Sequence, residues 1–224
     1  MIKHALVFAG GAFSENTLLE LPADVIEADI WCADSGVEHA ISCGLWPKVI
    51  VGDSDSVSQS SLAKAIEHGA KIIEHPVNKN ASDLELTLKE LTDAEYTDIT
   101  LLAASGGRTD HALFNWLLVL QQDWPCRFTV IDNTVSAYLV HSDVSFDAEL
   151  LPGTTVSLIS RESVSGVTTQ GLKYPLTDAR LMGGSTLGLS NEVSAVAELP
   201  TRVQVKVSSG RLLVCVVHSA AIEI

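Results

Sequence analysis

The sequence predicts an α/β fold: a mostly parallel sheet with flanking helices over residues 1–132, followed by an all-β domain over residues 133–224. Two observations support this prediction. In the first part, short apolar runs alternate with segments of helical period, which is typical of βαβ units. In the second part the helical period disappears, and strand-like runs are separated by Gly, Pro and Ser turns. A chain of 224 residues with 46% hydrophobic content has the length of one large domain or two modest ones.

The first part contains six apolar runs that we expect to be strands. Between them lie segments of helical pattern, such as "SQSSLAKAIEHG" and "SDLELTLKELTDAE". In the second of these segments, Ser82 and Glu85 have the spacing of a capping box, which predicts that a helix begins there. The predicted strands are "HALVFAG", "DIWCAD", "KVIVGD", "KIIEHP", "DITLLAAS" and "RFTVIDN".

The second part contains further strand-like runs without helices between them. They include "AYLVHSDVSF", "TTVSLISR" and "GVTTQGL". The segment "TRVQVKVSSGRLLVCVVHS" reads as two strands, and the turn residues "SSG" between them predict a β-hairpin.

Charge and composition exclude several classes of function. The formal net charge is -14, with only 14 Lys and Arg residues, which argues against nucleic acid as a partner. The four cysteines are scattered without a C-x-x-C pair, so neither a disulfide framework nor a structural zinc site is indicated. No apolar run reaches the roughly 18 residues of a membrane span. The N-terminal "ALVFAGGAF" reads as a strand entering a glycine turn, so we expect a cytoplasmic protein.

Aspartates collect where the predicted parallel strands end. Asp34 follows the second strand, Asp53 and Asp55 follow the third in "VGDSDSV", and Asp83 follows the fourth. Ligands of such sheets bind beyond the carboxyl ends of the strands, and grouped aspartates repel one another unless a cation lies among them. Carboxylates together with substrate phosphates are what Mg²⁺ prefers. The residues alone leave open a second interpretation of "GDSDS", a turn followed by a helix N-cap.

Two further motifs offer groups that bind phosphate. Lys79 and Asn80 stand just before the predicted helix, and "SGGRTDH" follows the fifth strand with two glycines and Arg108, a bidentate donor. His111 in the same motif is equally well explained as a capping or core histidine. The chain has no G-x-x-x-x-G-K-[ST] and no G-x-G-x-x-G, so metal-bound carboxylates would carry more of the binding. The apolar positions of this helix that we expect to face the core are Leu113, Trp116, Leu117 and Leu120.

Four motifs in order resemble the thiamine pyrophosphokinase (thiamine diphosphokinase) family. They are "CADSGVEHAISCGLWPKVIVGDSDSV", "HPVNKNASDLELTL", "SGGRTDHALFNWLLVL" and, more loosely, "GGSTLGLSNEV". The resemblance implies an α/β nucleotide-binding catalytic domain over residues 1–132 and a β-sandwich domain for thiamine binding and dimerisation over residues 133–224. It also implies ATP as co-substrate, Mg²⁺ as cofactor, thiamine as acceptor, thiamine diphosphate and AMP as products, and a homodimer.

The resemblance also implies roles for individual residues. Asp53, Asp55 and Asp83 would form the catalytic centre and hold Mg²⁺. Ser190 and Asn191 match the family's C-terminal motif and would contact thiamine, on a loop that reaches the partner subunit's nucleotide domain. The residues that would bind ATP and its phosphates are Asp34, Gly36, Lys79, Asn80, Ser82, Arg108, Asp110 and His111.

The chain departs from the family pattern at two places. Ser82-Asp83 replaces a threonine-aspartate pair, which keeps the hydroxyl. Asp34-Ser35-Gly36 replaces aspartate-glycine-glycine, so a side chain stands where the family has a glycine, which bears on the local backbone.

Two alternative functions remain at this stage. One is a diphosphokinase for another hydroxymethyl heterocycle, such as a pterin, which would use the same acids. The other is a non-catalytic nucleotide- or thiamine-binding module. That module would be expected to lack one or more of the motif residues, and all of them are present: Asp53, Asp55, Asp83 and Arg108.

Overall fold

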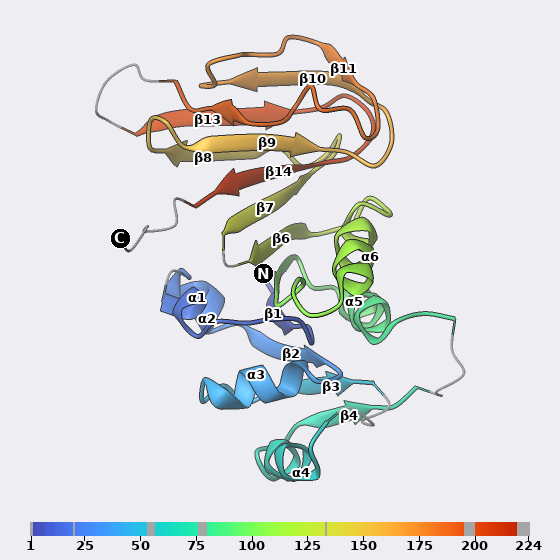
Figure 1. Ribbon diagram of the computed structural model, residues 1–224. Helices are drawn as coiled ribbons and strands as arrows, with labels where there is room; N and C mark the ends of the chain where they lie inside the picture. The colour runs from blue at the N-terminus through green and yellow to red at the C-terminus, as the bar shows by residue number, and fades with distance from the viewer. Residues whose placement is uncertain are drawn as a thin grey trace. The chain divides into compact units, whose positions relative to one another are not determined.

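The chain folds into two compact units (Figure 1). The computed structural model describes residues 2–19, 21–52, 57–75, 80–132, 134–194 and 200–218. The N-terminal unit comprises Met1–Leu118 and Trp124–Asn133, and the C-terminal unit comprises Val119–Asp123 and Thr134–Ile224. The assignment of nucleotide binding to residues 1–132 and of thiamine binding to residues 133–224 stays a prediction.

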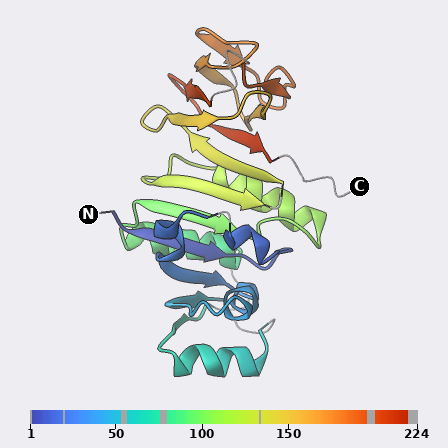
Figure 2. The same ribbon diagram turned by 90° about the vertical axis from the view of Figure 1, so that its left-hand side faces the viewer.

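The N-terminal unit is built on six parallel strands in the order β6-β5-β1-β2-β3-β4. Each strand lies within one of the apolar runs named above, so the predicted α/β fold is confirmed. Figure 2 shows the central strands β1, β2 and β3 running side by side. The strands are β1 (His4–Phe8), β2 (Asp29–Ala33), β3 (Val49–Val51), β4 (Lys71–Ile73), β5 (Asp98–Leu102) and β6 (Arg127–Asp132).

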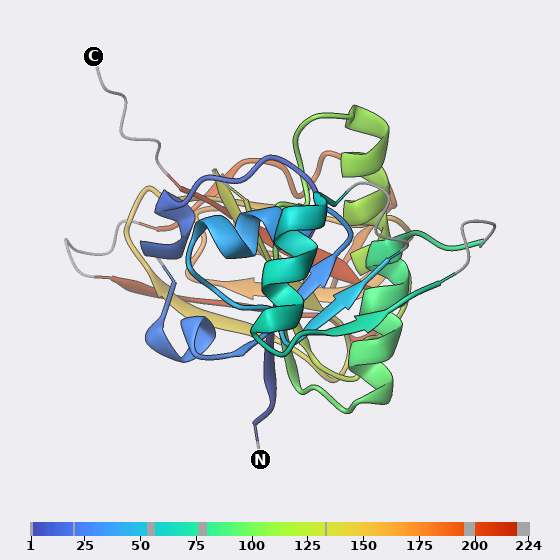
Figure 3. The ribbon, with the colours of Figure 1, turned by 90° about the horizontal axis from the view of Figure 1, so that it is seen from below.

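Helices cover both faces of this parallel sheet. Alternate strand residues such as Leu6 and Phe8 pack against apolar residues of α2, α3 and α4, whereas α5 contacts β2 and β3. Seen from below (Figure 3), α3 and α4 lie next to each other, and α5 and α6 lie on the other side. The helices are α1 (Asn16–Leu19), α2 (Ala23–Ile26), α3 (Gly36–Ser42), α4 (Gln59–Glu67), α5 (Asp83–Asp93) and α6 (Thr109–Val119).

The strand order places a crevice at the carboxyl end of β1. From β1 the chain continues to β2 on one side, and β5 is the neighbour on the other side. Connections therefore leave β1 and β5 in opposite directions, and the loops beyond these two strands separate. Such a switch point is where open α/β sheets bind ligands.

Helix α3 begins in direct contact with the end of β1. A Cβ atom added to Gly36 would overlap the carbonyl oxygen of Phe8, whereas one added to Gly10 would meet only the Ser35 hydroxyl. Replacing Gly36 with Ala is therefore expected to lower the free energy of unfolding by about 1–3 kcal/mol, because a backbone oxygen must move. Gly10→Ala should cost less, because a hydroxyl can rotate away. Urea denaturation of both variants measures the difference, and equal losses would contradict this account of the close approach.

The prediction that Leu113 and Leu117 face the core is wrong. Their exposed fractions are 59% and 40%, and that of Phe114 is 73%, whereas Leu120 is buried and Trp116 is half-buried. The stretch "HALFNWLLVL" is apolar on every side of the helix, so its periodicity cannot select the buried face. Helix α6 thus presents apolar side chains to solvent.

The C-terminal unit is a β-sandwich of two antiparallel sheets. One sheet has the order β12-β9-β14-β7 and the other β11-β10-β13-β8. Its core is made of inward-facing side chains from both sheets, such as Leu158 and Val214 from the first and Val167 and Val205 from the second. The strands are β7 (Val135–Val140), β8 (Phe146–Leu150), β9 (Thr155–Ile159), β10 (Val164–Gln170), β11 (Ala179–Leu181), β12 (Asn191–Glu192), β13 (Thr201–Lys206) and β14 (Leu212–Val217).

The predicted hairpin around "SSG" is wrong. Strand β13 pairs with β8 and β10, and β14 pairs with β7 and β9, so the two strands belong to opposite sheets. Ser208 and Ser209 hydrogen-bond to Ser165 as the chain crosses between the sheets. Both strands bury one face in the shared core, and a short turn sequence cannot distinguish a hairpin from such a crossing.

The four cysteines are free thiols, as the spacing predicts. Cys32, Cys126 and Cys215 are buried, and burial raises the pKa of Cys126 and of Cys215 to about 12. The longest helices in the described ranges, α5 and α6, have 11 residues each, and none is long and apolar enough to span a membrane.

Candidate functional site

A pocket of about 560 Å³ opens at the switch point of the parallel sheet. Its walls are residues 9–12 after β1, residues 33–35 after β2, residues 82–84 at the start of α5, and residues between Ala104 and Asn115 after β5. Because parallel strands all end at the same edge, these four segments meet although they are far apart in the sequence. The pocket lies wholly within the N-terminal unit.

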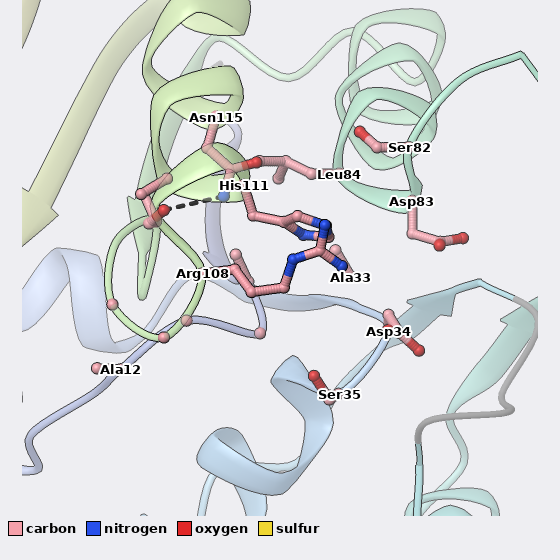
Figure 4. Close-up of a pocket in the computed structure, with 17 residues that line it drawn as sticks. Ala12, Ala33, Asp34, Ser35, Ser82, Asp83, Leu84, Arg108, His111 and Asn115 are labelled. Atoms are coloured by element: carbon pink, nitrogen blue, oxygen red, sulfur yellow. Dashed lines mark hydrogen bonds between the residues drawn. The ribbon is translucent and has the colours of Figure 1, made fainter.

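Asp34 and Asp83 lie together on one side of this pocket (Figure 4). A Cβ atom on Gly52 would be 3.2 Å from Asp83 Oδ1 and 3.4 Å from Asp34 Cα, so both acids flank the residue that precedes "DSDS". Asp34 has φ 50°, a left-handed conformation that costs roughly 1–3 kcal/mol unless its surroundings enforce it. Its Oδ1 atom is buried and has no hydrogen-bond partner among the described residues.

Asp53, Asp55 and Lys79 lie outside the described residues. Within the ranges that the structure describes, no group of three or more His, Cys, Asp or Glu side chains has the arrangement of a metal site. A metal site that included Asp34 and Asp83 would therefore need at least one further ligand. Asn80 is described and is exposed, two residues before the N-cap of α5.

The residues on either side of "DSDS" are held by hydrogen bonds. Before it, Gly52 N–H donates to the Ile73 carbonyl at 3.2 Å. After it, Ser58 N–H donates to Glu38 Oε1 at 2.9 Å, and Ser61 Oγ donates to Glu38 Oε2 at 2.5 Å. Burial opposes ionisation of Glu38, but these hydrogen bonds outweigh it and lower the pKa of its carboxyl. The sequence offered no signal for Glu38, which lies on a neighbouring helix.

Ser82 is the N-cap of α5, as the capping-box spacing predicts. Its Oγ accepts a hydrogen bond from Glu85 N–H at 3.2 Å. The Oε1 atom of Glu85 accepts from Lys89 Nζ at 2.9 Å. Asp83 is therefore the first helical residue, where the helix dipole favours a negative charge.

Ser35 does not strain the backbone of the "DSG" turn. It is the N-cap residue of α3 with φ -61° and ψ -7°, a conformation that any residue adopts. The left-handed residue in this turn is Asp34 itself. The serine that replaces the family's glycine is thus accommodated, and its hydroxyl occupies the space above Gly10.

Arg108 and Asp110 form a bidentate ion pair at the start of α6. Arg108 Nε donates to Asp110 Oδ1 at 3.1 Å, and a terminal guanidinium nitrogen donates to Oδ2 at 2.6 Å. The hydrogen bonds from Arg108 lower the pKa of Asp110 to about 2. Arg108 and His111 line the pocket across from Asp34 and Asp83 (Figure 4). Asp110 is not among the described residues that line the pocket.

The segment after β5 completes the pocket with main-chain groups. Asn115 Nδ2 donates to the Ala104 carbonyl at 2.9 Å, and Trp116 Nε1 donates to Ser105 Oγ at 2.9 Å. In the part of the chain that the structure describes, the N–H groups of Gly106 and Gly107 donate to no protein acceptor. Asn115 was missed by the sequence reasoning, although its position four residues after His111 places both on one helix face.

Ser190 and Asn191 lie in the C-terminal unit. Ser190 has φ 56°, and its N–H donates to Ser157 Oγ at 3.0 Å. Asn191 uses its side-chain amide within the unit: Oδ1 accepts from Tyr174 N–H at 3.1 Å and Nδ2 donates to the Tyr174 carbonyl at 2.8 Å. Asn191 therefore shapes the loop, and the hydroxyl of the exposed Ser190 is the better placed of the two to meet a ligand.

Comparison with known proteins gives one consistent result. Residues 26–128 match the model "Thiamin pyrophosphokinase, catalytic domain", and residues 141–212 match "Thiamin pyrophosphokinase, vitamin B1 binding domain". A thiamine pyrophosphokinase of Bacillus subtilis is 26% identical over 86% of this chain and 90% of its own length. Thiamin pyrophosphokinase 1 of Caenorhabditis elegans is 27% identical over 66% of this chain and 63% of its own length.

Solved structures show the same fold. The crystal structure of thiamine pyrophosphokinase from Bacillus subtilis superposes with a TM-score of 0.78 at 22% identity, covering 97% of this chain and 100% of that chain. Thiamin pyrophosphokinase from Candida albicans gives a TM-score of 0.75 at 17% identity, covering 97% of this chain and 90% of that chain. Both domain models of one family thus match in the expected order, and the chain belongs to the thiamin pyrophosphokinase family.

Proposed function

We propose that this protein transfers a diphosphate group from ATP to the hydroxyl of thiamine, in a Mg²⁺-dependent reaction that gives thiamine diphosphate and AMP. The observation that carries the proposal is the buried, unpartnered Oδ1 atom of Asp34 beside Asp83, facing a cationic arginine across the pocket. Acids on one side and phosphate-binding groups on the other suit a nucleotide held through a metal ion. The match to both family domains supports thiamine as the acceptor.

The acids fit Mg²⁺ by their chemistry. An ionised carboxylate oxygen that is buried without a donor is costly, and a hard cation offsets that cost. Asp83 together with the predicted ligands Asp53 and Asp55 would hold the ion, with Asp34 next to them. When bound, Mg²⁺ neutralises charge on the phosphate oxygens.

Arg108 is suited to bind phosphate because its present partner is weakly bound. The side chains of Arg108 and Asp110 have exposed fractions of 71% and 57%, and surface ion pairs of this kind add little stability. A phosphate can therefore replace Asp110 as the bidentate partner at small cost. The N–H groups of Gly106 and Gly107, which donate to no acceptor among the described residues, and the N-terminus of the 11-residue helix α6 add further attraction for an anion. Lys79 and Asn80 remain proposed phosphate contacts.

The reaction forms one bond and breaks one. The thiamine hydroxyl oxygen bonds to the β-phosphorus of ATP, the bond from that phosphorus to the α,β-bridging oxygen breaks, and AMP leaves with that oxygen. The hydroxyl proton passes to an aspartate of the site. The chain positions the substrates and stabilises the transition state electrostatically. Arg108 stabilises the negative charge that develops on the transferred phosphate groups.

We further propose a homodimer with composite sites, supported by two exposed apolar surfaces. The first, on α6 beside the pocket, is formed by Leu113, Phe114 and Leu117. The second, on the loop that leads to Ser190 in the C-terminal unit, is formed by Met182, Leu187 and Leu189. Exposed apolar groups of this kind mark interaction surfaces. In a two-fold dimer, the loop of one chain would meet the helix and pocket of the other, twice.

The nucleotide product tests the proposed bond. Purified protein with ATP, Mg²⁺ and thiamine is expected to produce AMP and thiamine diphosphate in equal amounts, because the diphosphate moves as one group. Anion-exchange chromatography of the reaction measures both products. ADP with thiamine monophosphate would contradict the proposal. Turnover of a hydroxymethyl pterin without turnover of thiamine would favour the related diphosphokinase, and ATP binding without any turnover would favour a binding module.

A further inference from the structure

The loop after β1 is bound to the loop after β5 through its main chain. Gly11 N–H donates to the Ala103 carbonyl at 2.9 Å, and Ala12 N–H donates to the Ser105 carbonyl at 2.6 Å. Both loops line the pocket. The peptide unit between Gly11 and Ala12 is thus bonded to one neighbour through its N–H, and because the unit is planar its carbonyl points to the opposite side.

His39 of α3 supplies that second contact. Its Nε2 lies 2.8 Å from the Gly11 carbonyl oxygen. A carbonyl only accepts hydrogen bonds, so Nε2 carries the hydrogen and donates it. The Phe13 ring lies 5.4 Å from the His39 ring and 5.4 Å from the Phe8 ring, which places the imidazole against the end of the same loop.

We propose that His39 is a positioning residue of the nucleotide site, which fixes the Gly11–Ala12 peptide by donating to its carbonyl. The adjacent glycines Gly10 and Gly11 give this loop more backbone freedom than any other residue pair would, so without the bond from His39 the peptide is held on one side only, by its N–H, and rotates more easily. A loop that occupies the competent conformation only part of the time lowers the apparent affinity for its ligand by that fraction. The inference rests on the proposed function, which makes ATP the ligand of this pocket.

Two substitutions separate the hydrogen bond from the ring contact. His39→Phe keeps a ring against Phe13 and removes the donor, whereas His39→Gln keeps an N–H donor near the Nε2 position and removes the ring. His68→Phe is the matched control. His68 is the C-cap of the neighbouring helix α4, where its Nδ1 lies 2.9 Å from the Lys64 carbonyl and its ring stacks on Trp46 at 3.4 Å, outside the pocket.

Calorimetric titration with ATP and Mg²⁺ is the first measurement, with the KM for ATP beside it. His39→Phe is expected to raise both the Kd and the KM for ATP roughly threefold to tenfold, the worth of one hydrogen bond, while kcat and the KM for thiamine stay near wild type. His39→Gln and His68→Phe should keep wild-type affinity. If His39→Gln loses as much ATP affinity as His39→Phe, the donor is not what matters and the inference is wrong.

Hydrogen exchange without nucleotide is the second measurement. The amides of Gly11 and Ala12 should exchange faster in His39→Phe than in wild type or His39→Gln, because the peptide that joins them is released. Unchanged exchange and unchanged ATP affinity in His39→Phe would overturn the role of His39 alone. A wild-type protein that binds no ATP would overturn the proposed function, and the role of His39 in nucleotide binding with it.

Discussion

Replacing Asp83 with Asn is expected to lower turnover by about two to three orders of magnitude, the size of effect seen when a charge-stabilising group is removed from an active site. Asp83 opens α5 at the edge of the pocket and lies beside Gly52 and Asp34. The substitution keeps the shape of the side chain, and the loss of its charge at the helix N-terminus costs at most about 1 kcal/mol. The melting temperature should therefore stay close to that of wild type while activity is lost.

Glu85→Gln is the matched control for this experiment. Glu85 stands two residues further along the same helix turn, outside the pocket lining, and pairs with Lys89. The Glu85→Gln substitution removes the same charge from the same helix end as Asp83→Asn does. Because Glu85 lies outside the pocket lining, turnover should be almost unchanged. Initial rates at saturating ATP and thiamine give the turnover of both variants, and thermal melts give their stability. Equal activity in Asp83→Asn and Glu85→Gln would mean that Asp83 serves only the helix.

Asp53→Asn and Asp55→Asn are expected to behave like Asp83→Asn. If "GDSDS" were only a turn and an N-cap, each substitution would cost about 1 kcal/mol of stability and leave turnover intact. The structure assigns the N-cap of α4 to Ser58, whose Oγ accepts from Ser61 N–H. Capping of α4 thus needs neither aspartate, and the role of Asp53 and Asp55 as metal ligands stays a prediction that these two variants test.

Mixing two inactive variants is expected to restore activity toward about a quarter of wild type, if two chains share each site. One variant carries Asp83→Asn in the N-terminal unit, and the other carries Asn191→Ala, which releases the Tyr174 backbone from the loop of the C-terminal unit. At equal mixing half of the dimers are heterodimers. Each heterodimer has one site with both lesions and one site with none, which gives the quarter.

Subunit exchange has to be demonstrated in the same sample, by mass spectrometry of chains with different isotope labels. Sites confined to single chains would each keep one lesion, so activity would stay near that of the unmixed variants. Exchange without recovery would therefore rule out composite sites. Replacing Phe114 with Ser in wild type is a useful companion, because loss of the dimer and of activity together would connect the exposed face of α6 with the shared site.

The sequence predicts most of the fold because strands and helices in the first part have strong local signals. Every predicted parallel strand is present, and Ser82 caps α5 as its spacing indicates. The errors arise where local pattern is compatible with two arrangements. The run "HALFNWLLVL" is apolar all round, so the buried face of α6 depends on packing. The "SSG" turn joins strands of opposite sheets because both bury valines in one core.

The site is less predictable than the fold, because its geometry depends on contacts between distant segments. Asp34, Asp83 and Arg108 could be predicted as site residues because each follows a predicted strand, and a parallel sheet brings the loops after its strands to one edge. The bond from Arg108 to Asp110 was not foreseen, although a cation and an anion two residues apart can pair with each other. Glu38 and His39 act from one turn of α3 on loops that the sequence does not place next to them.

The buried Oδ1 atom of Asp34 also affects the stability of the folded chain and therefore its resistance to proteolysis. Among the described residues, the buried Asp34 Oδ1 has no hydrogen-bond partner and the Asp34 backbone is left-handed, and both features lower the stability of the folded chain. Any ligand that binds only the folded chain raises the free energy of unfolding in proportion to the logarithm of its concentration. Because proteases act on the small unfolded fraction, the proposed metal and nucleotide ligands would lengthen the lifetime of the chain as well as support its activity.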